Sequence, residues 1–283
     1  MAKFTLSGFA DEIDPALDVQ IEGLSRLGIG HLEIRVADGR NIADYNPAQA
    51  RVLARRLGDA GIAVSAIGSP IGKIGIEEPF EPHLGLFKNV LELARILNAP
   101  YIRLFSFFMP DGGDPEAHTG EVLRRMGAFV GAARGSGITL LHENEKAIYG
   151  DVPSRCLALL KAFPGEIFAT YDPSNFVQCG VNNLLAFEAL LPYLRYVHIK
   201  DSLVEDKLPR RDRGAEGISD AHRPAGLGDG ELEYILRRLD DEDYEGFLSI
   251  EPHLSATTLF GETGFERFAT ATKALRSLLA GLG

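Results

Sequence analysis

The sequence predicts an α/β protein folded as a single-domain (β/α)8 barrel over residues 1–283. Eight short β-rich runs alternate with longer amphipathic stretches, and strands that alternate with helices form parallel βαβ units. Eight such units close into a barrel. No linker or low-complexity segment interrupts the order, so we expect one domain. The alternative is an open doubly wound sheet, but the phosphate-binding glycine fingerprint of that fold does not follow the first strand.

Each predicted strand is a short run enriched in β-branched, aromatic and other apolar residues, which favour a pleated and buried surface. Several of the runs end in a charged or polar residue. The eight predicted strands are Phe4–Phe9, His31–Arg35, Ile62–Gly68, Tyr101–Phe107, Ile138–Glu143, Glu166–Asp172, Arg195–Lys200 and Phe247–Glu251.

The stretches between these runs carry apolar residues at spacings of three and four, the periodicity of a helix with one buried face. Examples are Asp14–Gly28, Pro47–Gly61, Pro82–Asn98 and Gly120–Gly137. Most of them end in glycine, as helix C-termini often do. The longest irregular connection is Asp201–Gly230, after the seventh strand. Connections of this length are often lids or binding loops, and a plain surface insertion is the alternative.

The composition is that of a soluble globular protein with a full core, because 45% of the residues are hydrophobic and 24% are charged. No apolar run is long enough to cross a bilayer, and the first residues do not resemble a signal peptide, so we expect a cytoplasmic protein. Cys156 and Cys179 are too few for a disulfide framework and lack metal-pair spacing. We expect both to pack as small buried residues.

The net charge argues against nucleic acid as a partner. The chain has 29 Lys and Arg residues against 40 Asp and Glu residues, a net charge of −11. An acidic surface repels phosphate backbones unless its positive charges cluster. The one arginine-rich stretch, Lys207–Arg213, is interrupted and flanked by acidic residues, so we interpret it as a solvated loop.

Polar residues gather where the last four predicted strands end, and this end of a barrel carries the active-site loops. Side chains alternate between the two faces of a strand. Strand parity directs four polar side chains toward the barrel axis at the same end of the barrel: Glu143, Asp172, His198 and Glu251. His142 has the opposite parity, and we expect it to be a core histidine.

Three carboxylates at one point need a counter-charge, because like charges at close range raise each other's pKa. A divalent cation resolves the repulsion. Three oxygen ligands and one imidazole suit Mn²⁺, Mg²⁺, Co²⁺ or Zn²⁺. The alternative is that Arg103 and Lys200 neutralise the acids without a metal ion. Since all four residues lie at matched strand ends, we favour one divalent metal ion.

Read with their flanking residues, these strand ends are LHENE, YDPSNF, VHIKD and SIEPH. They resemble the signature segments of the xylose isomerase-like TIM-barrel superfamily, in particular its sugar phosphate isomerase/epimerase branch. SGFADEID near the N-terminus, GSPIGK after the third strand and GLGDGELEY before the last strand resemble that branch too. The resemblance covers nearly the whole chain in the right order. It implies that one divalent metal ion is bound by Glu143, Asp172, His198 and Glu251.

The resemblance also implies a metal-dependent isomerase or epimerase that acts on a sugar, a ketose or a sugar phosphate. In epimerases of this superfamily two ligand glutamates flank the ketose, which makes Glu143 and Glu251 the expected catalytic residues. The metal ion polarises the carbonyl group and stabilises the enediolate that forms when the α-proton leaves. One carboxylate removes this proton and the other returns one from the opposite face. A proton shift to the neighbouring carbon gives isomerisation instead.

Three other functions follow from the same resemblance. Loss of a β-hydroxyl group gives dehydration, as in inosose dehydratases of the superfamily, and a non-catalytic sugar-binding barrel is a further alternative. The superfamily also includes apurinic-site endonucleases, but their three-metal site needs histidines where this chain has GSP, FSFF and Asn175. We therefore expect a small sugar or polyol as substrate, no nucleic acid, no membrane partner and, as is frequent in this branch, a homodimer.

Several further residues are expected to contact the substrate. Epimerases of this group commonly carry a histidine at the position of Asn175. An asparagine can bind a hydroxyl group there but cannot titrate. They also often carry an arginine after the seventh-strand histidine. This chain lacks that arginine, and the residues that can take its place are Lys200, His222 and Arg223.

The remaining candidates come from other strand ends. Glu33 and Arg103 have inward parity and can contact substrate, and a buried pair that fills the barrel is the alternative for both. Lys73 either contacts a phosphate or carboxylate of the substrate or lies in a turn. Glu145 and His253 are expected to support the metal ligands from outside.

Overall fold

The inner wall consists of eight parallel strands in the computed structural model, which describes residues 3–204, 207, 221–254 and 261–282. Around the wall the strands follow the order β1-β12-β9-β8-β7-β6-β5-β2. In the described part of the chain no ladder joins β1 to β2, although these strands are in contact, so the barrel is nearly closed. The wall strands are β1 (Lys3–Gly8), β2 (His31–Ile34), β5 (Ala63–Gly68), β6 (Tyr101–Leu104), β7 (Thr139–Glu143), β8 (Ile167–Tyr171), β9 (Leu194–Ile199) and β12 (Glu245–Ile250).

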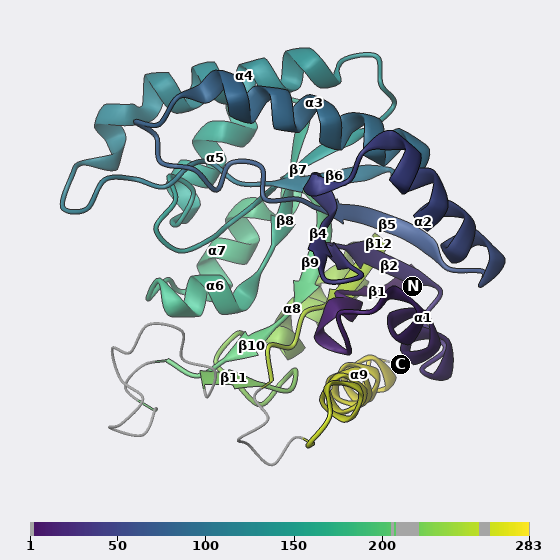
Figure 1. Cartoon of the computed structure of the whole chain (residues 1–283). Helices are drawn as coiled ribbons and strands as arrows, with labels where there is room; N and C mark the ends of the chain where they lie inside the picture. The colour runs from purple at the N-terminus through teal and green to yellow at the C-terminus, as the bar shows by residue number, and fades with distance from the viewer. Residues whose placement is uncertain (1–2, 205–206, 208–220, 255–260, 283) are drawn as a thin grey trace.

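Helices cover the outside of the wall, and α9 lies beside α1 near both ends of the chain (Figure 1). Capping motifs in the local sequence mark where two of these helices begin. Asn46 and Gln49 form a capping box ahead of α2, and Thr263 and Glu266 do the same for α9, which satisfies backbone N–H groups of the first turn. The helices are α1 (Leu17–Arg26), α2 (Pro47–Asp59), α3 (Phe80–Ile96), α4 (Thr119–Ala133), α5 (Pro153–Ala162), α6 (Pro173–Gln178), α7 (Asn183–Leu190), α8 (Leu232–Asp241) and α9 (Gly264–Ala280).

Short elements complete the described connections. The antiparallel pairs are β3 (Val36–Ala37) with β4 (Arg40–Asn41), and β10 (Asp201–Ser202) with β11 (His222–Arg223). The 3₁₀ turns are η1 (Ala10–Glu12), η2 (Ile42–Asp44), η3 (Pro115–His118) and η4 (Leu191–Tyr193). Because η1 and β10 directly follow β1 and β9, both lie at the C-terminal end of the wall strands.

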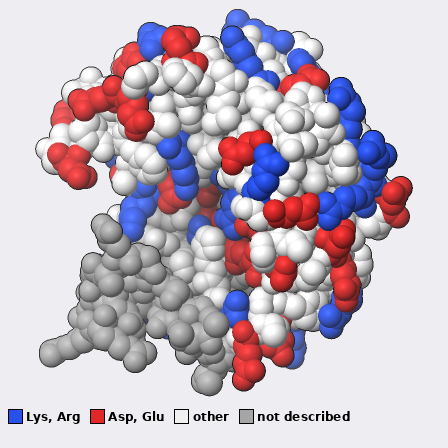
Figure 2. Space-filling model, viewed as in Figure 1, with Lys and Arg blue, Asp and Glu red and all other residues white. Residues whose placement is uncertain are grey.

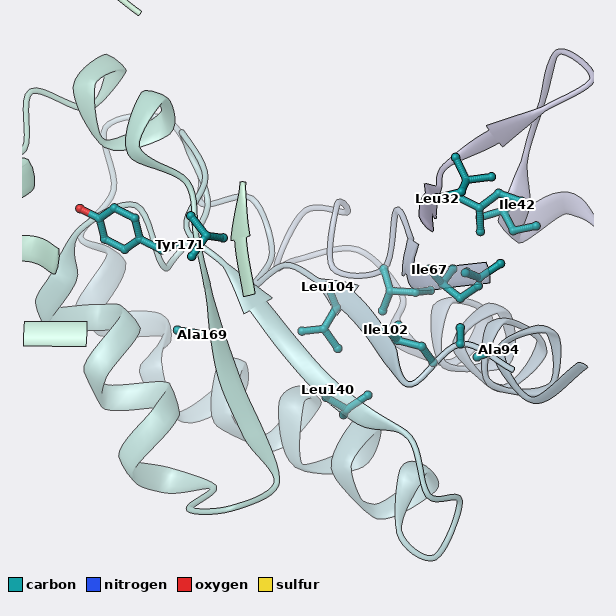
Figure 3. Packing of buried hydrophobic residues seen from close by; sticks show 14 of the residues in the cluster. Leu32, Ile42, Ile67, Ala94, Ile102, Leu104, Leu140, Ala169 and Tyr171 are labelled. Carbon is teal, nitrogen blue, oxygen red and sulfur yellow. The ribbon is translucent and has the colours of Figure 1, made fainter. Parts of the chain in front are cut away.

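The main hydrophobic core lies between the strands and the helices. Ile67 of β5 and Ile102 of β6 lie near Ala94 of α3, and Leu140 of β7 continues the same apolar surface (Figure 3). Full burial of one such aliphatic side chain contributes about 1.5–3 kcal/mol relative to exposure. Apolar residues of the wall strands therefore meet the helix layer, as strand alternation predicts.

The inside of the barrel is filled by side chains. A small apolar cluster of Ala66, Leu141 and Tyr196 is separate from the main core. Hydroxyl groups adjoin it, because Ser65 Oγ lies 2.8 Å from Tyr196 Oη and 2.6 Å from Ser7 Oγ. These hydrogen bonds satisfy polar groups that would otherwise be buried at a cost. The filled interior leaves the ends of the strands as the place where polar chemistry can be carried out.

All eight predicted strands correspond to wall strands, and only the fourth differs by more than two residues at either end. The run Tyr101–Phe107 predicts a longer strand than β6, which ends at Leu104. Phe105 N donates to Ile71 O at 2.8 Å, and Phe107 N donates to Gly72 O at 2.9 Å. The chain thus leaves the wall and pairs with the segment that follows β5. That second pairing also buries apolar residues, and this explains why the apolar run continues beyond the strand.

In the described part of the connection Asp201–Gly230, hydrogen bonds join the first residues of the connection to the last ones. The Asp201 carboxylate accepts hydrogen bonds of 2.9–3.0 Å from four backbone N–H groups, those of Ser202, Gly226, Gly228 and Gly230. Charge-assisted bonds of this kind are about twice as strong as neutral ones. They fix the chain directly after Lys200 and directly before α8. Residues 205–206 and 208–220, with most of the predicted loop at Lys207–Arg213, lie outside the described residues.

Charged side chains of both signs are interspersed on the described surface that Figure 2 shows. Among the exposed ion pairs are Arg124 with Glu121 at 2.7 Å and Arg134 with Glu166 at 2.8 Å. Exposed pairs contribute about 0–1 kcal/mol each. Within the residues described, none of the helices is both long enough and apolar enough to cross a membrane.

Gly72 provides a test of the contact between the segment after β5 and the segment after β6. Its φ is +88°, and an added Cβ would overlap the backbone carbonyl of Phe105. Gly61 has a similar φ of +70°, but within the described structure no atom lies within 4 Å of an added Cβ. We expect Gly72→Ala to lower the free energy of unfolding by about 3 kcal/mol and Gly61→Ala by about 1 kcal/mol. Urea denaturation measures both, and equal losses would contradict the contact.

Candidate metal centre

Four polar side chains meet at the C-terminal ends of neighbouring wall strands. Glu143 ends β7, Asp172 follows β8, His198 lies in β9 and Glu251 follows β12. Each is at most 4% exposed, and one possible ligand atom of each lies within 4.8 Å of the others. This is the group that strand parity predicts from the sequence.

His198 is at the centre of this group. Its Nδ1 atom lies 3.2 Å from Glu251 Oε2, 3.3 Å from Glu143 Oε1 and 3.7 Å from Asp172 Oδ2. Among the described residues, four buried atoms of the group have no hydrogen bond: His198 Nδ1, Asp172 Oδ2, Glu143 Oε2 and Glu251 Oε2. Leaving one such atom unsatisfied costs about 1–3 kcal/mol. Unsatisfied atoms of three carboxylates and one imidazole in a single group fit a divalent cation.

Asp172 is oriented by its second role as the N-cap of α6. Its Oδ1 accepts a 2.9 Å hydrogen bond from Asn175 N, and Pro173 occupies the first helical position. Asn144 holds the Asp172 backbone on both sides, with Nδ2 donating to Asp172 O at 2.8 Å and Oδ1 accepting from Asp172 N at 2.9 Å. These bonds leave Oδ2 facing the cluster.

Glu143 is held by two residues that the sequence predicts as substrate contacts. Asn175 Nδ2 donates to Glu143 Oε1 at 3.1 Å and also to Asn144 O at 2.9 Å. Arg103 Nε lies 2.9 Å from Glu143 Oε2, an ion-pair contact without hydrogen-bond geometry. Arg103 Nη1 donates to Ser69 O at 2.8 Å, which anchors the guanidinium group to the backbone. Asn175 and Arg103 therefore orient a cluster glutamate, and contact with substrate stays a prediction for both.

Glu33 lies behind His198. The two Glu33 oxygens are 3.2 and 3.3 Å from His198 Nε2, and Arg103 Nε is 3.8 Å from Glu33 Oε1. Glu33 has no exposed surface and lies beside Arg103, the partner in its predicted alternative of a buried pair, and contact with substrate stays a prediction. Burial lowers the pKa of His198, but the neighbouring carboxylates, Glu33 first, raise it well above its ordinary value. A cation would therefore take the place of the proton on Nδ1, while Glu33 holds the proton on Nε2.

Glu251 is contacted on both oxygens. Oε1 accepts a 2.8 Å hydrogen bond from Arg35 Nη1 and lies 3.4 Å from His253 Nε2. Lys200 Nζ lies 3.6 Å from Oε2 and 2.7 Å from Asp172 Oδ2, so its ammonium group is among the ligand atoms. His253, predicted to support the ligands from outside, thus contacts one of them directly.

Charges within the cluster outweigh the effect of burial. Burial raises the pKa of the Glu143 carboxyl group, but the charges of His198 and Arg103 lower that pKa to about 2. Burial lowers the pKa of Lys200, but the carboxylates beside it raise the pKa above its ordinary value. Glu143 and Glu251 therefore stay ionised at neutral pH, which is the state that binds a cation.

Lys73 and Glu145 pair with each other. Lys73 Nζ lies 2.9 Å from Glu145 Oε2 and 4.2 Å from the centre of the Phe105 ring. The pair links the segment after β5 to the segment after β7 and is partly exposed. Glu145 therefore has Lys73 as its ion-pair partner, and its support of the metal ligands stays a prediction. A substrate anion that contacts Lys73 would have to displace Glu145 from it.

The other predicted residues lie around the cluster. His222 of β11 packs edge-on against His253, with ring centres 5.2 Å apart, and Arg223 Nη1 donates to His222 O at 2.8 Å. His142 is buried, and its Nε2 lies 2.9 Å from Ser106 Oγ. Burial lowers the pKa of His142 to about 4, which is typical of a neutral core histidine.

Arg35 and Asn144 contact the cluster, and neither is among the residues predicted from the sequence. Arg35 follows β2 with the same parity as Glu33, so strand alternation was an available signal for it. Asn144 follows Glu143 with the opposite parity, so strand alternation does not direct it to the barrel axis. Its place at the end of a strand is the only sequence feature that could have predicted its role.

A second group has the composition of a metal site. Glu12, Glu251 and His253 each offer a ligand atom within 4.8 Å of the others. Arg35 already lies beside this group, with Nη1 2.8 Å from Glu251 Oε1 and Nη2 3.7 Å from Glu12 Oε1. Because the guanidinium group supplies the positive charge here, we assign a cation only to the first group.

Comparison with known proteins gives the relatives of the chain. No curated protein sequence matches it. Among solved structures, the IOLI protein with a bound zinc atom has a TM-score of 0.78, 16% identity and coverage of 99% of both chains. A D-tagatose 3-epimerase-like protein has a TM-score of 0.75 and 16% identity, with coverage of 99% of this chain and 98% of the other. The probable 3-DHS dehydratase AsbF from Bacillus anthracis has a TM-score of 0.74 and 17% identity, with 97% and 98% covered.

At these identities the structural likeness shows the fold alone. The sequence comparison shows the family. The model of the family described as xylose isomerase-like TIM barrel matches residues 21–278, which is most of the chain. This chain therefore belongs to the xylose isomerase-like TIM barrel family.

Proposed function

We propose that the protein is a divalent-metal-dependent isomerase or epimerase of a small sugar, with or without a phosphate group. The observation that carries this proposal is the buried group of Glu143, Asp172, His198 and Glu251, each of which has a side-chain atom without a hydrogen bond. Their oxygen and imidazole donor set suits Mn²⁺, Mg²⁺, Co²⁺ or Zn²⁺. Membership of a family whose structural relatives include an epimerase-like protein and a zinc-bound protein supports it.

A cation bound by these four residues supplies positive charge that polarises the carbonyl group of a ketose. Glu143 and Glu251 then move the protons. One carboxylate removes the α-proton of the substrate, which gives an enediolate, and the other returns a proton from the opposite face to invert the carbon. Return of the proton to the neighbouring carbon gives the isomer. Both carboxylates are ionised in the cluster, so either can act as the base, and the one that returns a proton first takes that proton from solvent.

Lys200 favours dehydration as a second candidate reaction. Its ammonium group is 4% exposed and lies 2.7 Å from Asp172 Oδ2, among the ligand atoms. Loss of a β-hydroxyl group from the enediolate needs a proton for the leaving oxygen. The Lys200 ammonium group could donate one when a cation shares the carboxylates that raise its pKa. The probable dehydratase among the structural relatives supports this candidate. Cytoplasmic location, a homodimer and a single domain over residues 1–283 stay predictions.

Metal binding is tested by thermal unfolding with MnCl₂ or with a chelator. A ligand at about 100 times its Kd adds about 2.7 kcal/mol to the stability of the folded state. For a chain of this size we expect Tm to rise by about 5–10 °C. Asp172→Asn keeps an oxygen that can cap α6 but removes a charged ligand, so its Tm should rise by much less. An equal rise in wild type and Asp172→Asn would contradict the assigned site.

Proton abstraction is tested by hydrogen–deuterium exchange. The metal-loaded protein is incubated in D₂O with a panel of ketoses and inosose, and NMR follows the loss of the α-proton signal. We expect exchange with at least one compound, and Glu143→Gln should slow it by about 10²- to 10⁴-fold. The control is Glu166→Gln, which alters an exposed glutamate that pairs with Arg134 and precedes β8. A metal-loaded protein that exchanges none of the compounds would support a sugar-binding barrel instead.

Lys200→Met separates the two candidate reactions. If Lys200 protonates a leaving hydroxyl group, the variant should lose dehydration by about 10²-fold or more, while exchange of the α-proton continues. Its Mn²⁺ affinity should stay equal or increase, because a positive charge beside the cation is removed. Mass spectrometry detects the loss of water from the substrate. A variant that dehydrates the substrate at the wild-type rate would show that Lys200 has no such role.

A further inference from the structure

The two oxygens of Glu251 have different surroundings. Oε2 lies 3.2 Å from His198 Nδ1 and has no hydrogen bond, so it faces the cluster. Oε1 accepts a 2.8 Å hydrogen bond from Arg35 Nη1. The two residues are far apart in the sequence, and the barrel brings the segments after β2 and β12 together.

Arg35 is itself fixed on several sides. Its Nε and Nη2 atoms are each 2.9 Å from Asp11 Oδ2, and its guanidinium carbon lies 4.5 Å from the centre of the Phe9 ring. The guanidinium group thus binds Asp11 along one edge and presents Nη1 to Glu251. A planar group with several N–H donors in fixed directions can serve both carboxylates, whereas a lysine ammonium group has no such fork.

The segment after β12 is held against the same place. Glu12 Oε2 accepts a 2.8 Å hydrogen bond from His253 N, and Glu12 Oε1 lies 3.0 Å from His253 Nδ1. His253 has a φ of +47°, an unusual conformation for a residue with a side chain, and its Nε2 lies 3.4 Å from Glu251 Oε1. Residues that follow β1, β2 and β12 therefore enclose one oxygen of one cluster glutamate.

We propose that Arg35 is a positioning residue, which holds Glu251 Oε1 away from the cluster so that Oε2 alone binds the cation. This inference rests on the metal site proposed above. Without Arg35, Oε1 would keep only the 3.4 Å contact with His253 Nε2, and the carboxylate would turn toward other donors such as Lys200. Partners that orient ligands in this way typically change metal affinity by about 10- to 100-fold when they are removed.

The test compares Mn²⁺ affinity in the wild type and in Arg35→Met, by electron paramagnetic resonance of free Mn²⁺. We expect the Kd of Arg35→Met to rise by about 10- to 100-fold. Arg56→Met is the matched control, because Arg56 is 29% exposed against 24% for Arg35 and also binds two aspartates, Asp18 and Asp38. Arg56 lies on α2 and has no contact with the cluster among the described residues, so its variant should keep the wild-type Kd.

Chemical rescue separates positioning from a general structural role. Guanidinium chloride at low millimolar concentration should restore most of the Mn²⁺ affinity of Arg35→Ala, because the free cation can occupy the vacated place. Arg35→Lys should bind Mn²⁺ with an intermediate Kd, and it also covers the case in which Arg35→Met fails to fold. An Arg35→Met variant with the wild-type Kd would overturn this inference and leave the proposed function intact. A wild-type protein that binds no Mn²⁺, Mg²⁺, Co²⁺ or Zn²⁺ would overturn the proposed function itself.

Discussion

The constraint on which the site depends is the burial of three carboxylates around one imidazole. Glu143, Asp172 and Glu251 each direct an oxygen toward His198, and all four side chains are almost fully inaccessible. Like charges at this spacing repel each other strongly in a medium of low polarity. Lys200 and Arg103 offset part of the repulsion but leave four ligand atoms without hydrogen bonds. The four side chains could hold a divalent cation, which would add positive charge where Lys200 and Arg103 leave atoms without hydrogen bonds.

The surrounding residues hold the opposite side of each ligand. Asn175 bonds Oδ1 of Asp172 through its backbone and Oε1 of Glu143 through its side chain, while Glu33 lies against the far nitrogen of His198. Arg35 does the same for Glu251. Two of these partners, Glu33 and Arg35, come from β2 and its end. In the described part of the chain, β1 and β2 form no ladder with each other. Contacts between side chains therefore link the β2 segment to β9 and β12 at this end of the barrel, where backbone hydrogen bonds do not.

The sequence predicts the wall strands and the four ligand candidates because both depend on local patterns. Alternation within a strand decides whether a side chain points inward, and it directs Glu143 and His198 to the axis while leaving His142 in the core. The partners of Arg35 and Glu33 depend on long-range contacts instead, since they lie 216 and 165 residues away in the chain. The end of β6 could not be predicted for the same reason, because an apolar run does not reveal which of two neighbours it will pair with.

The two cluster glutamates are not equivalent, although parity alone makes them look alike. Arg35 gives Glu251 Oε1 a hydrogen bond with good geometry, and the side chain of Arg35 is in turn fixed by Asp11. Arg103 approaches Glu143 Oε2 at the short distance of 2.9 Å but without hydrogen-bond geometry, because its guanidinium group is committed to Ser69 O. In both glutamates Oε1 has a hydrogen bond and Oε2 has none. Glu143 Oε2 lies 2.9 Å from the guanidinium group of Arg103, whereas Glu251 Oε2 lies 3.2 Å from the imidazole of His198. In the proposed reaction this difference leaves Glu251 Oε2 to bind the cation. The charge of Arg103 helps to keep Glu143 ionised, which is the state in which it can take the first proton from a substrate.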